Sequence, residues 1–268
     1  MFPRPRRLVL PAVLLTAALA ACAAGDASGG SPTGPTTTTP SDPNPTAGVA
    51  TGTVVDTRGQ PLAGVQVIAD YLLAENTNAI GATDAQGRYS IDVGQPAGTW
   101  HMTAHLRREY QGETFDLYLD PDSDAPFAGN AGVVRNFCWR LTGPRADGLG
   151  FYGGTVQVNV DRQGWAADIH SPDIEFTFAP VGPLIDGSTG RTLTLRTSQQ
   201  DVYTIRDVPI GTYAITARYA PDGQAPRPMV LRWYGQGTYA DTLTSTWPVR
   251  NATHYPDLLD VQVAPAGD

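Results

Sequence analysis

The chain has 268 residues and a formal net charge of −8, and every one of its 18 basic residues is an arginine. An acidic chain with no basic tract beyond its first ten residues argues against nucleic-acid binding and against electrostatic docking on anionic lipid. The absence of lysine excludes Schiff-base chemistry and a phosphate-binding loop built around lysine.

The first 22 residues have the pattern of a secretory signal. Arg4, Arg6 and Arg7 precede an apolar run over residues 8–18, which is too short to span a bilayer. Residues 19–22, Leu-Ala-Ala-Cys, resemble the lipobox of bacterial lipoproteins. That resemblance implies a signal peptide over residues 1–21, cleavage before Cys22 and lipidation of Cys22. The alternative is an ordinary signal peptide followed by a chance cysteine.

Residues 22–47 begin with Cys22 and otherwise contain only Gly, Ser, Thr, Pro, Ala, Asn and Asp, without a large apolar side chain. Such a segment buries too little apolar surface to offset the conformational entropy lost on ordering. It is expected to be a disordered tether between the lipid and the folded part of the chain.

From residue 48 onward the sequence predicts β-structure. Short runs alternate between apolar and polar residues and are interrupted every 8 to 12 residues by turn formers. Trp100, Met102, Ala104 and Leu106 share one parity, which is typical of a half-buried strand. The pattern predicts an all-β chain with two antiparallel β-sandwich domains of transthyretin or immunoglobulin type, over residues 48–143 and 150–268.

The first domain resembles a known family. Segments 51–56, 59–67, 83–91 and 98–100 look like the carboxypeptidase regulatory-like domain, and segments 56–59 and 84–87 have the Asp-x-x-Gly pattern of tight hairpin turns. The resemblance implies a small transthyretin-like sandwich of about seven antiparallel strands. It implies a scaffold and no chemistry.

The second domain repeats part of this pattern. Segments 203–208 and 211–217 parallel segments 89–93 and 98–104, with Tyr213 in the place of Trp100. The similarity predicts a second sandwich of related type, as a diverged repeat. Convergent strand patterning is the alternative.

The chain lacks the residues of a zinc peptidase. A zinc carboxypeptidase needs a His-x-x-Glu pair and a further histidine, and none of the four histidines begins that pair. These are His101, His105, His170 and His254. His101 and His105 are spaced as a zinc pair on a helix, but on a strand they lie too far apart, and His101 is expected to point outward as a polar residue.

Two groups of residues remain as candidate binding sites. Asp120, Asp122 and Asp124 resemble the start of a calcium loop, although Ala125 and Pro126 replace the residues that an EF-hand requires. The alternative for these carboxylates is a solvated acidic turn, so calcium is a candidate ligand and no other cofactor is expected.

Exposed aromatic side chains are the second candidate, because the apolar face of a sugar ring stacks on a flat partner. Tyr234, Tyr239 and Trp247 have no clear inward assignment, and they form the candidate ligand-binding platform.

These observations predict a non-catalytic, extracytoplasmic binding or structural module. Its expected partners are the cell membrane or outer membrane through lipidated Cys22, and a glycan or another envelope protein, but no nucleic acid. The alternatives are a carbohydrate-binding surface lipoprotein and an enzyme with a site between its two domains.

Overall fold

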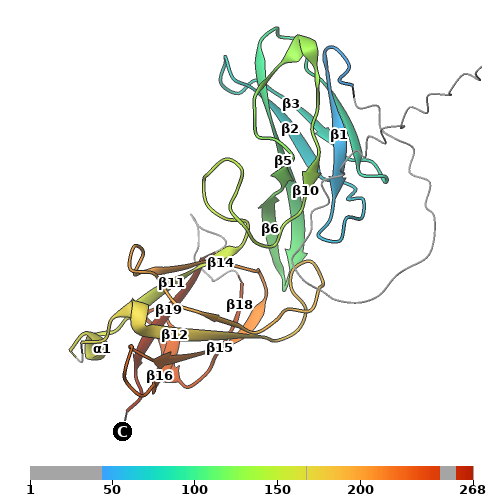
Figure 1. The fold of residues 1–268 in the computed structure, drawn as a ribbon. Coiled ribbons are helices and arrows are strands. Elements are labelled where there is room, and N and C mark those ends of the chain that lie inside the picture. The colour runs from blue at the N-terminus through green and yellow to red at the C-terminus, as the bar shows by residue number, and fades with distance from the viewer. Residues whose placement is uncertain (1–43, 167, 248–257, 268) are drawn as a thin grey trace, which may run out of the picture.

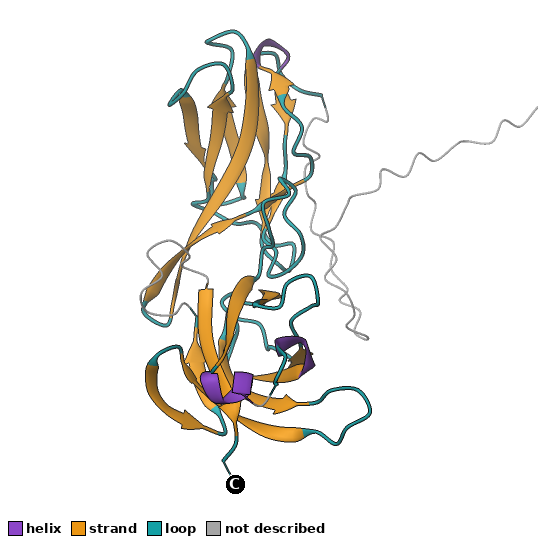
Figure 2. Cartoon of the chain, turned by 90° about the vertical axis from the view of Figure 1, so that its left-hand side faces the viewer, coloured by secondary structure: helices purple, strands orange, loops and turns teal. Residues whose placement is uncertain are grey.

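The structure is a computed structural model that describes residues 44–166, 168–247 and 258–267. The predicted signal peptide, Cys22 and the predicted tether up to residue 43 lie outside this range. Within it, no helix combines the length and the apolar character needed to cross a bilayer. Figure 1 shows two β-domains, one above the other, and Figure 2 shows that strands dominate both. The prediction of an all-β fold is confirmed.

The first domain is a sandwich of two five-stranded sheets. One sheet has the order β4-β1-β10-β7, with β9 also paired to β1, and the other has the order β3-β2-β5-β6, with β8 paired to β5. The first sheet contains β1 (Val49–Val55), β4 (Arg88–Asp92), β7 (Asp120–Pro121), β9 (Val133–Val134) and β10 (Phe137–Cys138). The second contains β2 (Gln66–Tyr71), β3 (Asn78–Ala82), β5 (Thr99–Tyr110), β6 (Glu113–Tyr118) and β8 (Phe127–Ala128), and a 3-10 turn, η1 (Gly129–Ala131), follows β8.

Alternation along β5 builds the core between these sheets. Trp100, Met102, Ala104 and Leu106 are all buried, and the residues between them are partly exposed. The predicted parity of this strand is therefore confirmed. Its cause is the two-residue period of a strand, which sends every second side chain into the sandwich.

The two predicted Asp-x-x-Gly turns form, and the first closes a single antiparallel bridge between Val55 and Pro61, but neither turn joins two strands of one sheet. Asp56 Oδ1 accepts hydrogen bonds from the amides of Arg58 and Gln60 at 2.8 Å each, and Gly87 ends the second turn with a φ of +69°. The first turn follows β1 and the second follows β3, and each leads the chain to the opposite sheet. Local hydrogen bonding determines the turn, whereas the sheet that the next strand joins depends on distant residues.

The second domain is one continuous nine-stranded sheet that bends around its own core (Figure 1). Its order is β13-β12-β15-β16-β19-β11-β14, with β17 paired to β16 and β18 paired to β15. The strands are β11 (Gly154–Val160), β12 (Ile174–Pro180), β13 (Leu193–Leu195), β14 (Thr204–Val208), β15 (Thr212–Tyr219), β16 (Arg227–Trp233), β17 (Gln236–Ala240), β18 (Leu243–Thr246) and β19 (Leu258–Pro265). A short helix, α1 (Arg162–Ala166), and a 3-10 turn, η2 (Ser171–Asp173), lie between β11 and β12.

Most strand pairs of the described chain are antiparallel, as predicted, but both domains also contain parallel pairs. β1 pairs in parallel with β9 and β10, and β11 pairs in parallel with β19. Alternation in a sequence is the same for either direction, because it reports burial on one face and not the neighbour's orientation.

The two domains share a strand-pairing scheme. In the first domain β1 pairs with β4, β2 with β3 and β5, and β5 with β6. In the second domain β11 pairs with β14, β12 with β13 and β15, and β15 with β16, all antiparallel. The diverged repeat stays a prediction, since convergent sandwiches of one type also share a pairing scheme.

The domains contact each other through turns at their facing ends. The Arg58 guanidinium donates to the backbone carbonyl of Asp186 at 3.1 Å, and the Thr57 hydroxyl donates to the Asp186 carboxylate at 2.7 Å. The Tyr110 hydroxyl donates to the carbonyl of Pro183 at 2.9 Å. β1 therefore runs toward the second domain, and the N-terminal end of the described chain lies at the far end of the first domain.

Candidate functional site

The three carboxylates of the predicted calcium loop bind different protein partners. The partners are Tyr152 (2.7 Å) and Arg140 for Asp120, the amide of Asn136 (3.1 Å) for Asp122, and His101 Nε2 (2.8 Å) for Asp124. In the part of the chain that the structure describes, no group of three or more His, Cys, Asp or Glu side chains is arranged to hold a metal ion. Calcium binding at this loop stays a prediction, and the structure gives these carboxylates a role in joining loops.

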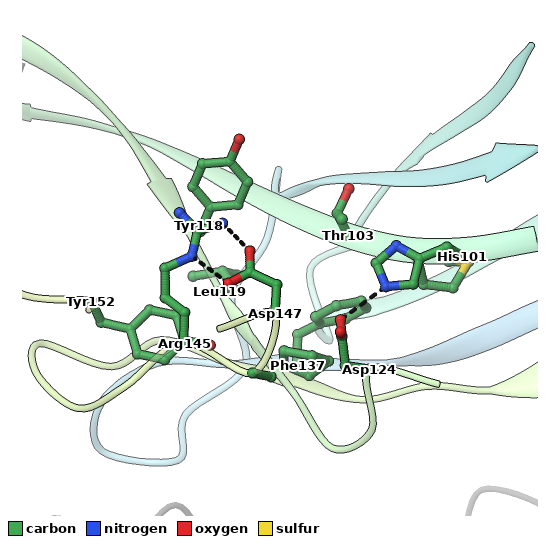
Figure 3. A pocket seen from close by; sticks show the side chains of 12 residues that line it. His101, Thr103, Tyr118, Leu119, Asp124, Phe137, Arg145, Asp147 and Tyr152 are labelled. Atoms are coloured by element: carbon green, nitrogen blue, oxygen red, sulfur yellow. Dashed lines mark hydrogen bonds and ion pairs between the residues drawn. The ribbon is translucent and has the colours of Figure 1, made fainter. Parts of the chain in front are cut away.

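A small cavity lies where the interdomain linker packs on the first domain (Figure 3). The Arg145 guanidinium covers the Tyr118 ring at 3.8 Å from its centroid and pairs with Asp147. The cavity has a volume of about 30 Å³, which suits a single water molecule and no substrate. The predicted alternative of an enzyme site between the domains gains no support from this cavity.

His101 lies at the edge of the same cavity. Its side chain is only 22% exposed, and its ring bonds Asp124. The expected parity of His101 is confirmed, because it points away from the buried set of β5, but its side chain is covered. An acidic loop packs over this face of β5, which a strand pattern does not reveal.

The predicted aromatic platform does not form as a unit. Trp247 is fully buried and belongs to the core, Tyr239 is partly buried with the Arg232 guanidinium 4.4 Å from its ring centroid, and Tyr234 is 53% exposed. Trp247 fits inside because Gly154 has no side chain, and a Cβ there would lie 2.5 Å from the indole. Of the three residues, only Tyr234 presents an open aromatic surface.

A larger cleft opens on the side of the second domain, at the end of β11 that lies away from the linker. It has a volume of about 590 Å³, and its lining includes Trp165, Asp168, His170, Asp173, Gln199 and Tyr203. We call it the distal cleft. The β11–β12 connection forms one wall and the β13–β14 loop forms the other. β11 begins beside the linker and ends at this cleft, which fixes the cleft's distal position.

The wall that carries Trp165 is a capped turn. Asp161 Oδ1 accepts from the amide of Gly164 at 2.8 Å, and its carbonyl accepts from the amide of Trp165 at 3.0 Å. Gly164 is required, since a Cβ there would lie 2.4 Å from Val160. Buried Ile169 holds the turn on the core and leaves the Trp165 side chain 70% exposed. The turn thus presents an indole to solvent from a fixed base.

The wall that carries Tyr203 is fixed by Asp201. This carboxylate accepts from the hydroxyl of Thr204, from the amides of Tyr203 (3.3 Å) and Thr204 (3.1 Å), and from Arg206 at 2.6 Å. The hydrogen bond from Thr204, aided by the Tyr203 amide and the Arg206 charge, lowers the pKa of Asp201 below its ordinary value. Tyr203 is 63% exposed on this wall.

Between the two aromatic side chains the cleft is polar and acidic. Asp168 and His170 lie 3.3 Å apart and are solvated, with side chains 92% and 66% exposed. Asp168 has a φ of +56°, which is uncommon for a residue with a side chain. No arginine occurs among the lining residues that the structure describes. These groups can exchange hydrogen bonds with a polar ligand.

The repeat pattern placed Tyr203 in the position of Tyr89, but the two side chains differ. Tyr89 is 5% exposed, whereas Tyr203 lies just before β14 begins and projects into solvent. Trp165 was not assigned from the sequence. The signal that could have found it is the Asp161-x-x-Gly164 cap directly before it, which predicts a turn with an aromatic residue on its surface.

The comparisons with known proteins give only remote similarity. No family model matches the chain, and no curated protein sequence matches it significantly. Among solved structures the chain is similar to the Bacillus anthracis TIE protein (12% identity, TM-score 0.29, 82% of this chain and 34% of that one). It is also similar to a streptococcal ancillary pilin (12%, 0.24, 82% and 62%) and to a DUF3823 family protein from Bacteroides uniformis (14%, 0.24, 76% and 100%). The chain spans about a third of the length of the TIE protein and under two thirds of the length of the ancillary pilin. TM-scores this low carry no argument about function.

Proposed function

We propose that this chain is a non-catalytic, extracytoplasmic module, anchored to a membrane through lipidated Cys22, that holds the distal cleft away from that membrane. The observation that carries the proposal is where the chain begins and which domain carries the cleft. The described chain begins at the far end of the first domain, and the distal cleft belongs to the second domain, at the end of β11 that lies away from the linker (Figure 1). A lipid at the N-terminal side would therefore place the first domain between the membrane and the cleft.

Contacts between the domains support a spacer role. Asp186 receives hydrogen bonds from Thr57 and Ser188, and the carboxylate of Asp207 accepts from the amides of Gly143 at 2.8 Å and Gly153 at 3.2 Å. These bonds tie the linker to the second domain and the second domain to the first. With the domains and the linker joined in this way, the first domain acts as a spacer between the tether and the cleft.

The character of the cleft supports binding without catalysis. Catalytic sites usually exclude water from the reacting groups. The Asp168 and His170 side chains of the cleft are exposed to solvent. Exposed aromatic and polar groups on capped turns suit recognition of a ligand.

The anchor is tested by fractionation and by metabolic labelling with an alkyne analogue of palmitate. The native chain and a Ser41→Ala control in the tether should label and stay in the membrane fraction, and Cys22→Ser should do neither. If Cys22→Ser still carries the label and sediments with membranes, the anchor assignment is wrong.

A further inference from the structure

We infer that the distal cleft binds a neutral saccharide, held by the exposed rings of Trp165 and Tyr203. This inference rests on the proposed function, because it names the ligand class of the same cleft. Both aromatic side chains line one cavity of about 590 Å³, and that volume lies in the range of small-ligand sites. An indole and a phenol ring together offer two flat apolar surfaces for the C–H faces of sugar rings.

The polar groups between the rings match a ligand rich in hydroxyls. Asp168 and Asp173 offer carboxylate acceptors, His170 offers a ring nitrogen, and Gln199 offers both a donor and an acceptor. Sugar hydroxyls both donate and accept, so they can satisfy this mixed set. A purely apolar ligand would displace water from these groups and leave them without hydrogen-bond partners.

The charge of the lining selects against anionic ligands. Among the described residues that line the cleft there are two carboxylates and no arginine to balance them. An acidic polysaccharide would meet repulsion from Asp168 and Asp173. The ligand class is therefore neutral.

Both aromatic side chains are held ready for binding. Asp161 caps the turn under Trp165, and Asp201 caps the segment that carries Tyr203. A ring whose backbone is already fixed loses less conformational entropy when it binds. This pre-organisation distinguishes the two residues from an aromatic side chain that is merely exposed, such as Tyr234.

A saccharide fits better than an extended peptide. A peptide that adds to a sheet needs an open strand edge for backbone hydrogen bonds. Among the described lining residues only Val160 lies on a strand; β11 pairs there with β19, and its pairing with β14 reaches only to Gln157. The open edge at the end of β11 is too short to pair with a peptide strand, so the site offers mainly side chains.

The test is a titration of the purified full chain in detergent with glycogen, laminarin, xyloglucan and galactomannan, followed by calorimetry. Alginate serves as the acidic comparison and a proline-rich peptide as the peptide comparison. Trp165→Ala and Tyr203→Ala should each weaken binding of at least one neutral polysaccharide by about tenfold or more, as the loss of a stacking contact does. Tyr234→Ala is the matched control, because it removes an exposed ring outside the cleft. The affinity of this variant for the polysaccharide should equal that of the native chain.

Three results would overturn the inference: no binding of any neutral polysaccharide, equal binding by all variants, or tighter binding of alginate or of the peptide. Thermal unfolding of each variant separates lost affinity from lost folding. The titration is done in solution and does not depend on the anchor. If no neutral polysaccharide binds while Cys22 is labelled, the saccharide inference is wrong and the proposal of an anchored module is unaffected.

Discussion

The hydroxyl of Tyr239 donates a hydrogen bond of 3.2 Å to Asp161, the residue that caps the turn beneath Trp165. Tyr239 was a candidate ligand contact from the sequence, and in the structure it supports the distal cleft from behind. Burial first, and then the negative charge of Asp161, raise the pKa of the Tyr239 hydroxyl.

Removal of this hydroxyl should loosen the turn. Tyr239→Phe is expected to lower the free energy of unfolding by about 0.5–1.5 kcal/mol, the usual net value of one hydrogen bond. Amide hydrogen exchange in residues 162–166 should become faster. Tyr234→Phe is the control, and equal effects from both changes would show that Tyr239 has no special role.

Trp247 should behave as a core residue. Trp247→Ala is expected to cost about 3–5 kcal/mol, because it empties a large buried volume. Gly154→Ala should also destabilise the second domain, since the new Cβ would meet the indole at 2.5 Å. Urea unfolding measures both. A Trp247→Ala protein as stable as the native chain would contradict its burial.

The contact between the domains should weaken in acid. Burial raises the pKa of Asp186, but hydrogen bonds from Ser188 and Thr57 and the charge of Arg58 outweigh it and hold the pKa below the ordinary 3.8. A depressed pKa means that this carboxylate contributes stability above its ordinary value and loses that contribution as the pH falls through the folded-state pKa. Below about pH 4, small-angle scattering should therefore report a change in the domain arrangement.

Asp186→Asn should remove most of that pH dependence while the fold remains. If the scattering of the native chain and of Asp186→Asn changes with pH in the same way, another group controls the contact.

Asp207 should protect the linker from proteolysis. Its carboxylate binds the amides of Gly143 and Gly153, and its φ is +64°. Asp207→Gly keeps this backbone conformation accessible but removes the carboxylate, so trypsin should cleave faster after Arg145. Asp207→Asn retains an acceptor oxygen and should cleave at close to the native rate. Rapid cleavage of the native chain after Arg145 would contradict this role.

The sequence predicted the local features of the fold well. The parity of Trp100, Met102 and Ala104 follows from the strand period, and the turn at Asp56 follows from its own hydrogen bonds. Such features depend on residues a few positions apart. The parallel pairing of β1 with β10 joins residues more than 80 positions apart, and alternation carries no information about it.

The candidate site was harder to predict for the same reason. The residues around Trp247 in the sequence give it no clear inward assignment. Its burial depends on Gly154, which is distant in the sequence. The distal cleft combines Trp165 with Tyr203 from two separate connections. The antiparallel pairings of β11 with β14 and of β12 with β13 bring those connections to one end of the domain.

Hydrogen-exchange mass spectrometry of the full chain, with and without each of the four neutral polysaccharides, tests most directly whether the distal cleft is the functional surface. Residues 161–173 and 198–204 should gain protection with at least one polysaccharide, while the first domain and the segment around Tyr234 should not change. Protection confined to the first domain or to residues 232–238, or no protection with any polysaccharide, would contradict this assignment.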